Sequence, residues 1–343
     1  MTALPATPGP APVQPQRPGP IGSPRSAVLS LGSFAPEQRL TNADLELLVE
    51  TSDRWILERT GIHERRRVGS GETASVLGAA AARSALARAG DPPVDALLVA
   101  TSSPDTLFPS TACLVQRRLG LSGFPALDIS AACSGFVYAL VIADSLVRTG
   151  AAQHVLVVAT EAMTSLIDYG DRSTCVLFGD GAGAAVVGGV GSGGIAATHW
   201  AADGGESDLL YYGPGSEAGQ ESDAVRMAGR GTFRLAVERM VETAERLCAD
   251  AGWSVGDVGW VVPHQANLRI VEAVAKRLAV PMSRVVFNAD AYGNTSAASI
   301  PLALDEAQRD GRLRVGDRVL SMAFGAGATW GGVALEWTAP SPG

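Results

Sequence analysis

The chain has 343 residues, of which 46% are hydrophobic and 18% charged, and its net charge is −8. This composition suits a compact protein with a large core. The acidic balance argues against broad nucleic-acid binding, because phosphate recognition needs a basic face, and no apolar run approaches the roughly 20 residues of a membrane span.

The four cysteines, at positions 113, 133, 175 and 248, contain no CxxC pair and no metal or disulfide spacing. In a chain of this size that pattern predicts reduced thiols and no metal site. The N-terminus has no basic segment followed by an apolar one, so it does not resemble a secretory signal. We therefore expect a cytoplasmic protein that acts neither on a membrane nor on nucleic acid.

Residues 1–25 hold eight of the twenty prolines and few apolar anchors. Such a segment buries too little surface to offset the entropy of ordering it. We predict a disordered leader here and place the fold after it.

Short apolar runs alternate with longer helical patterns along the rest of the chain. Residues 94–100 and 155–159 are typical of buried strands, and residues 134–148 and 267–279 of helices. This alternation predicts an α/β fold in which sheets are covered by helices.

A weak internal repeat divides the chain into two similar halves, 26–190 and 191–343. A strand leads to Cys133 in the first half, and a strand at 285–288 leads to Asn294 in the second. A helix follows each residue and ends at Gly150 or Gly311, at the same distance along the chain. The repeat predicts a pseudo-twofold arrangement with Cys133 and Asn294 at equivalent helix starts.

Cys133 follows a strand and begins a helix made of small and apolar residues. The N-terminus of a helix favours a thiolate, and small neighbours leave room for a substrate. A buried structural cysteine is the alternative, and it is the better interpretation for the other three.

His264 and Asn294 are the other candidates for chemistry. His264 lies between a buried strand and a helix, where its Nε2 could face a cavity, although a helix cap or core position suits it equally. Asn294 could be an ordinary N-cap. Position alone decides neither case.

Seven segments of the chain carry more information together than any one of them alone. They are RWILERTGI (54–62), FPSTAC (108–113), DISAACSGF (128–136), DRSTCVLFGDGAGAAVV (171–187), PHQANLRI (263–270), YGNTSAAS (292–299) and FGAGATWGG (324–332). In this order and at this spacing they resemble the β-ketoacyl-acyl carrier protein synthase III family. The resemblance runs from about residue 26 to 337. It implies a thiolase-like fold, with two similar βα halves whose sheets are sandwiched between helices.

The resemblance also implies a decarboxylative Claisen condensation that starts fatty-acid or polyketide chains. Cys133 would carry the acyl group from an acyl-CoA, while His264 and Asn294 would stabilise the enolate formed when malonyl-acyl carrier protein loses CO₂. The backbone N–H groups of Cys133 and Ala326 would hold the thioester oxyanion. Acyl-CoA would be a substrate, and no cofactor or metal would be needed.

Further residues match binding positions of the family. Trp55 and Arg172 would sandwich the adenine of CoA, while its phosphates and pantetheine arm would contact Thr51, Arg59 and Asn267. An acidic carrier protein would dock on a basic face made by Arg234, Arg269, Lys276 and Arg277. Members are homodimers, and Phe108 would reach the acyl pocket of the partner.

Three other functions compete with this one. An acyltransferase of specialised metabolism would pass the acyl group to an oxygen or nitrogen acceptor, and such enzymes often lack the asparagine that is present here as Asn294. A thiolase would need a second cysteine near the C-terminal glycine loop, and none follows Cys248. A silent partner subunit would be expected to lose Cys133.

Overall fold

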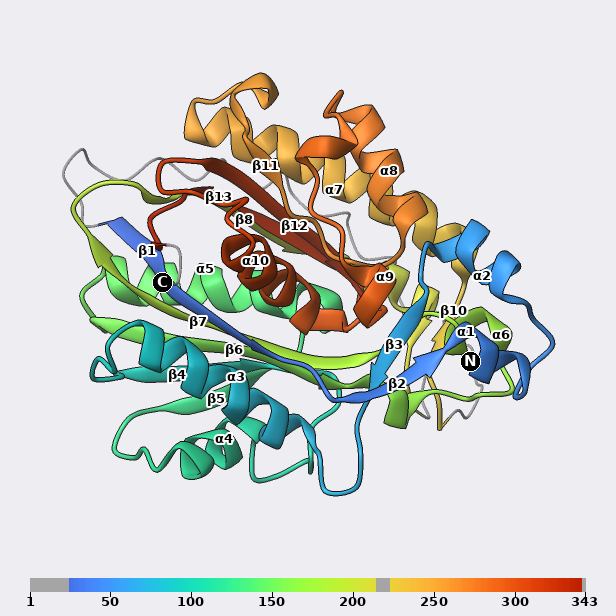
Figure 1. Cartoon of the computed structure of the whole chain (residues 1–343). Coiled ribbons are helices and arrows are strands. Elements are labelled where there is room, and N and C mark those ends of the chain that lie inside the picture. The colour runs from blue at the N-terminus through green and yellow to red at the C-terminus, as the bar shows by residue number, and fades with distance from the viewer. Residues whose placement is uncertain (1–24, 214–222, 341–343) are drawn as a thin grey trace, which may run out of the picture.

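The computed structural model describes residues 25–213 and 223–340. The predicted leader at 1–25 therefore lies outside the described residues, except for Arg25. Two main sheets, one of five strands and one of four, form the body (Figure 1). The first has the order β1-β7-β6-β4-β5, with bounds Arg25–Phe34, Asp180–Val190, His154–Ala162, Ala96–Ala100 and Ala126–Ile129.

The second sheet repeats the order of the first four of these strands as β8-β13-β12-β11, with bounds Gly194–Ala202, Thr329–Glu336, Arg318–Gly325 and Trp260–Val261. In the first sheet β7 and β6 pair antiparallel, and β4 pairs with β6 in parallel. In the second sheet β13 and β12 pair antiparallel, and β11 pairs with β12 in parallel. The predicted pseudo-twofold repeat and thiolase-like fold are thus confirmed. The division at 190/191 stays a prediction, and it falls between β7 and β8.

Five layers result, because each sheet is covered by helices on both faces (Figure 1). Helices α5 (Gly135–Arg148) and α10 (Ser299–Arg309) lie between the sheets in the largest apolar cluster. The outer face of the first sheet packs on α3 (Ala74–Arg88) and α4 (Thr111–Leu119). The outer face of the second packs on α7 (Gly229–Ala251) and α8 (Leu268–Arg277).

A smaller cap lies at one end of the layers and has an apolar cluster of its own. Its elements are α1 (Asn42–Glu46), α2 (Asp53–Thr60), α6 (Arg172–Cys175), α9 (Ala289–Tyr292), β2 (Gln38–Thr41), β3 (Glu64–Arg67), β9 (Leu210–Tyr211) and β10 (Arg226–Met227). No helix in residues 25–213 and 223–340 is both long and apolar enough to span a membrane.

The predicted strand at 285–288 is wrong, because Val285 forms only an isolated bridge with Val261. The side chain of Gln265 occupies the place of a neighbouring strand. Its Nε2 donates to Val286 O at 3.1 Å, and its Oε1 accepts from Asn288 N at 3.0 Å. A side-chain amide therefore satisfies the backbone groups that a ladder would otherwise pair.

The predicted equivalence of Cys133 and Asn294 is also wrong. Each inner helix is preceded by a 3₁₀ turn, Ala132–Ser134 before α5 and Ser296–Ala298 before α10. The first residues of these turns share a positive φ, 46° at Ala132 and 47° at Ser296. The structural counterpart of Cys133 is therefore Ala297, three residues beyond Asn294.

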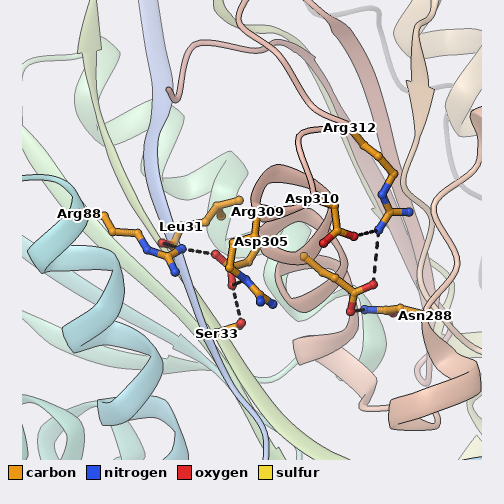
Figure 2. A network of polar contacts seen from close by, with 9 residues as sticks. Leu31, Ser33, Arg88, Asn288, Asp305, Arg309, Asp310 and Arg312 are labelled. Carbon is orange, nitrogen blue, oxygen red and sulfur yellow. Dashed lines mark hydrogen bonds and ion pairs between the residues drawn. The ribbon is translucent and has the colours of Figure 1, made fainter. Parts of the chain in front are cut away.

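A buried carboxylate fastens α10 to the first sheet (Figure 2). Asp305 is 1% exposed, pairs with Arg88 of α3 and with Arg309 at 3.1 Å, and accepts from Ser33 Oγ of β1. Arg88 also donates to Leu31 O at 3.0 Å. The network joins the central layer to an outer helix.

Replacing Asp305 with asparagine should destabilise the protein without touching the catalytic chemistry. Two arginines would lose their buried anion, which costs about 3–5 kcal/mol for a fully buried pair. Arg88 and Arg309 are partly exposed, so we expect a loss of about 2–3 kcal/mol. Urea unfolding checks this, and Asp310→Asn, which removes one exposed pair with Arg312, should lose less than about 1 kcal/mol.

Candidate active site

A cavity of about 510 Å³ opens where the two halves meet the cap. Cys133, His264 and Asn294 all line it, so the structure brings together the three residues predicted for chemistry. Most of the remaining wall is apolar, with Phe178, Leu210, Met227, Met240 and Phe324 among its side chains. An apolar cavity with a few convergent polar groups suits an acyl chain attached to a reactive end.

Cys133 lies in the 3₁₀ turn between β5 and α5 and is 5% exposed. Burial raises the pKa of its thiol to about 12, with a smaller upward contribution from the charge of Glu161 and a downward one from a hydrogen bond to Ser296. Burial thus opposes the ionisation that the helix start is expected to favour, and that expectation stays a prediction. The thiol must lose its proton as it reacts.

The turn that carries Cys133 packs against the turn between β12 and β13. Thr329 Oγ1 lies 2.9 Å from Ala131 O and 3.0 Å from Ala326 O, which ties the two turns together. Ala326 is half-buried beside Gly325, and Gly325 lies against the backbone N of Cys133. The two N–H groups predicted for the oxyanion hole are thus on adjacent segments.

Gly325→Ala should disrupt this arrangement. A Cβ at position 325 would lie 2.7 Å from Cys133 N and 3.0 Å from Ser134 N. Both are backbone atoms, so one of the turns must move, and a displacement near 1 Å can cost about 100-fold in rate. Acylation of Cys133 by an acyl thioester, followed by mass spectrometry, measures the loss. Gly189→Ala is the matched control, because a Cβ there meets nothing within 4 Å, and it should acylate at the wild-type rate.

His264 follows β11 and is held rigidly, at 3% exposure. Its backbone N donates to Met322 O at 2.8 Å, and its Nδ1 lies 2.7 Å from Ser299 Oγ at the start of α10. Ser299 Oγ accepts from Gln265 N at 3.3 Å, which leaves its own hydrogen to donate to Nδ1. This arrangement places the imidazole proton on Nε2, the tautomer that a donor to an enolate requires.

Burial lowers the pKa of His264 to about 3. The imidazole is therefore neutral at physiological pH, and it serves better as a hydrogen-bond donor than as a base.

Asn294 is 5% exposed and fixed by its backbone, whose N donates to Leu177 O at 2.8 Å and whose O accepts from Gly179 N at 3.0 Å. Its Oδ1 accepts from Ser296 N at 2.9 Å. The amide group is thereby oriented with Nδ2 as its remaining donor. His264 and Asn294 thus provide two neutral donors to one cavity.

Only some of the residues predicted to bind CoA line the cavity. Trp55, Arg59 and Asn267 line the cavity, and Asn267 also caps α8 through a 3.0 Å bond from Ile270 N. Thr51 does not line it, and its Oγ1 is buried with no hydrogen-bond partner among the described residues.

The guanidinium of Arg172 stacks directly on Trp55, 4.7 Å from the ring centroid. An adenine between them would need about 7 Å, two van der Waals contacts in series. The predicted sandwich is therefore closed in this structure, and Arg172, which also donates to Glu50 O at 2.9 Å, would have to turn away to admit a nucleotide.

All four residues predicted for carrier docking are exposed on α7 or α8: Arg234, Arg269, Lys276 and Arg277. Arg269 lines the cavity mouth together with Arg230, which the sequence did not single out. Lys276 and Arg277 lie at the far end of α8, about 10 Å along its axis from Arg269. Phe108 is 85% exposed beside Leu107, in a loop away from the cavity of its own chain.

Sequence reasoning missed several residues around the cysteine, above all Glu161, Ser296 and Ser299. Glu161 lies inside the apolar run of β6, where a fully buried acidic residue is itself an unusual signal. Ser296 and Ser299 are small residues of the segment that contains Asn294, and nothing in their identity distinguishes them from helix caps.

Comparisons with known proteins agree with this geometry. Residues 127–204 match the family 3-oxoacyl-[acyl-carrier-protein (ACP)] synthase III, and residues 248–337 match the C-terminal region of that family. The β-ketoacyl-[acyl-carrier-protein] synthase III of Thiobacillus denitrificans is 49% identical over 91% of this chain and 99% of its own. That of Methylococcus capsulatus is also 49% identical, over the same shares of the two chains.

Solved structures give the same result. The 3-oxoacyl-[acyl-carrier-protein] synthase III of Aquifex aeolicus is 46% identical, with a TM-score of 0.87 over 91% of this chain and 100% of its own. The priming β-ketosynthase of the R1128 polyketide pathway is 40% identical, with a TM-score of 0.88 over 95% of this chain and 100% of its own. The chain therefore belongs to the β-ketoacyl-acyl carrier protein synthase III family of condensing acyltransferases.

Proposed function

We propose that the protein condenses an acyl-CoA starter with malonyl-acyl carrier protein and releases CO₂, CoA and a β-ketoacyl-carrier product. The observation that supports this most strongly is the convergence of a buried thiol, Cys133, with two neutral donors, His264 and Asn294, in one apolar cavity. A thiol takes up the acyl group, and the two donors stabilise the enolate that decarboxylation leaves. The starter acyl group packs against the apolar wall of this cavity.

This chemistry needs no cofactor, because the thioester supplies the activated acyl group and loss of CO₂ generates the carbon nucleophile. CoA enters along Trp55, Arg59 and Asn267, and Arg172 turns away from Trp55 to admit the adenine. The acceptor thioester arrives on the pantetheine arm of the carrier protein by the same route.

The experiment supplies one acyl-CoA at a time together with malonyl-acyl carrier protein and measures product and CO₂. We expect both in equal amounts. Acyl transfer to an alcohol or amine without CO₂ release would contradict this proposal and favour the acyltransferase of specialised metabolism. The product enters fatty-acid or polyketide synthesis, and the 40% identity to a polyketide priming enzyme supports the second of these.

The acidic carrier protein docks on the exposed basic residues of α7 and α8, with Arg269 nearest the cavity. Arg269→Glu should raise KM for malonyl-acyl carrier protein about 10-fold or more at low salt, because one attractive charge becomes repulsive. The rate of acylation by acyl-CoA should change much less. Steady-state kinetics checks this, with Arg83→Glu on α3 as the control, and equal effects of both variants would contradict docking at α8.

The protein acts as a homodimer in the cytoplasm. Edge strand β5 and the exposed pair Leu107 and Phe108 provide an apolar surface that a second copy covers. Sedimentation at micromolar concentration tests the dimer, and a monomer at that concentration would contradict it.

A further inference from the structure

A fully buried arginine lies close to the cavity and takes no part in the chemistry above. Arg65, in β3, is 0% exposed. Among residues 25–213 and 223–340 it forms no ion pair. Burial lowers the pKa of its guanidinium to about 10, so the group is still charged at physiological pH. A buried charge of this kind is costly unless other acceptors replace the water that it loses.

Two neutral oxygens replace that water. Nε and Nη2 of Arg65 both donate to Val176 O, with Nε at 3.1 Å, and Nη1 donates to Asn42 Oδ1. Asn42 is itself 2% exposed, and its Nδ2 donates to Ile62 O at 2.9 Å and to Asp53 Oδ1 at 2.7 Å. The guanidinium is therefore fixed between two acceptors, an arrangement that the planar fork of an arginine allows and a lysine does not reproduce.

Val176 begins the segment that supports the asparagine of the site. Val176, Leu177 and Phe178 all line the cavity. Phe178 forms an isolated parallel bridge with Asn294. The backbone N of Asn294 donates to Leu177 O at 2.8 Å, and its O accepts from Gly179 N at 3.0 Å. Asn294 therefore takes its position from a segment that the guanidinium holds at its first residue.

The stem of Arg65 lies against the same bridge. A Cβ added at Gly293 would lie 2.7 Å from Arg65 Cγ, and one added at Gly179 would lie 3.2 Å from Arg65 Cβ. Gly293 precedes Asn294 and has a φ of 70°, which glycine adopts without strain. Gly179 follows Phe178 on the other side of the bridge. The stem thus fills part of the space that side chains at both glycines would occupy.

The direction of Asn294 Nδ2 depends on this support. The side chain is held through Oδ1, which accepts from Ser296 N within the same segment. A bond within a segment does not fix where that segment lies relative to the cavity. The backbone bonds to Leu177 and Gly179 fix it, and a displacement near 1 Å of a group that stabilises the transition state can cost about 100-fold in rate.

We propose that Arg65 is a positioning residue for Asn294, which holds residues 176–179 and the turn at Gly293 so that Asn294 Nδ2 faces the enolate. The proposal rests on the proposed function, in which that amide stabilises the enolate. Arg65 is not part of the cavity wall, and it acts through Asn294 without contacting the substrate.

Two simpler roles for Arg65 predict different results. A purely structural role would lower Tm and slow acylation and condensation by the same factor. A role as a positive charge that attracts the carrier-bound substrate would raise KM and leave kcat unchanged, and its effect would shrink as salt is added. Positioning of Asn294 instead lowers kcat for condensation and leaves the chemistry of Cys133 intact.

Arg65→Met is the first variant, because it keeps an unbranched stem and removes the guanidinium. The experiment measures single-turnover condensation of pre-acylated protein with saturating malonyl-acyl carrier protein. We expect product formation and CO₂ release to fall together by about 10-fold to 100-fold, as for a misplaced group. Alkylation of Cys133 by iodoacetamide should stay close to the wild-type rate. Equal losses in condensation and alkylation would overturn the proposal.

A double variant tests whether Arg65 acts through Asn294. In the background of Asn294→Ala, the change Arg65→Met should cause almost no further loss of condensation, because the group that Arg65 positions is gone. Losses that multiply in the double variant would show that Arg65 acts on another part of the site, and they would contradict the proposal.

Arg67→Met is the matched control. Arg67 lies on the same strand, is exposed, and stacks its guanidinium 5.6 Å from the ring centroid of Tyr169. It should condense at the wild-type rate, and a loss as large as that of Arg65→Met would count against a specific role for Arg65. If Arg65→Met yields no folded protein, Arg65→Lys replaces it. That variant keeps the stem and the charge but loses the fork, and it should show the same difference between condensation and alkylation in smaller measure.

Hydrogen exchange separates this inference from the proposed function, because it needs no substrate. In Arg65→Met, peptides that contain residues 177–179 and 293–295 should exchange about 10-fold faster or more, since their mutual bonds open more easily. A peptide of residues 264–271, which contains His264, should exchange as in wild type. If no acyl-CoA supports condensation by the wild type, the proposed function fails, and faster exchange would still support the positioning. Unchanged exchange at 177–179 and 293–295 would overturn it.

Discussion

Cys133→Ala is expected to abolish acylation of the protein and formation of the β-ketoacyl product. No other thiol lines the cavity, since Cys113, Cys175 and Cys248 are absent from its wall, and the acyl group would have no attachment point. Slow decarboxylation of malonyl-acyl carrier protein should persist, because His264 and Asn294 still stabilise the enolate. Intact-protein mass spectrometry and CO₂ release measure the two effects separately.

Cys113→Ala serves as the control for that experiment. Cys113 is exposed and lies on α4, away from the cavity, so this variant should keep wild-type acylation and condensation. An acyl adduct that survives in Cys133→Ala and is lost in Cys113→Ala would place the nucleophile at Cys113 and contradict its assignment to Cys133.

His264→Ala and Asn294→Asp should separate the two half-reactions. Each removes one neutral donor to the enolate, and the loss of one such donor typically costs about 10²–10³ in rate. Asn294→Asp keeps the Oδ1 that accepts from Ser296 N, so the turn that begins at Ser296 is retained. Acylation of Cys133 should stay close to wild type, while CO₂ release and product formation should fall together.

Single-turnover kinetics with pre-acylated protein provides the measurement, because it bypasses the first step. Condensation at the wild-type rate in both variants would contradict the assignment of these two residues. A loss of acylation as large as the loss of condensation would instead indicate that they act on the cysteine.

Much of the fold was predictable because buried strands leave a strong pattern. The apolar run at 155–159 lies in β6, and the helix expected at 134–148 corresponds to α5. The start of α5 was also informative, since a cysteine between a strand and a helix of small residues indicates a reactive position. The seven segments then identified the family, which the comparisons confirm.

The features that the sequence did not predict depend on contacts between segments far apart in the chain. Gln265 replaces a strand partner with its side chain, and no periodicity in 285–288 could show that. The two halves align through the positive φ of Ala132 and Ser296, whereas spacing in the sequence placed Asn294 opposite Cys133. The direct stacking of Arg172 on Trp55 is a side-chain arrangement that the motifs do not contain.

Glu161 illustrates the same limit within the site. In the sequence it interrupts a buried strand by one residue. Only the folded chain places three distant segments around Glu161. They contribute Ser103 from the segment after β4, Ala297 from the turn before α10, and Cys133 from the turn before α5.

The most direct test of the central claim is an acylation and chase of the wild-type protein, followed by intact-protein mass spectrometry. Incubation with an acyl-CoA should add one acyl group, which peptide mapping places on Cys133. Addition of malonyl-acyl carrier protein should remove that group as the β-ketoacyl product forms and CO₂ is released. An adduct that persists with the malonyl carrier and leaves only for an alcohol or amine, or the absence of an adduct with every acyl-CoA tried, would contradict the condensing function.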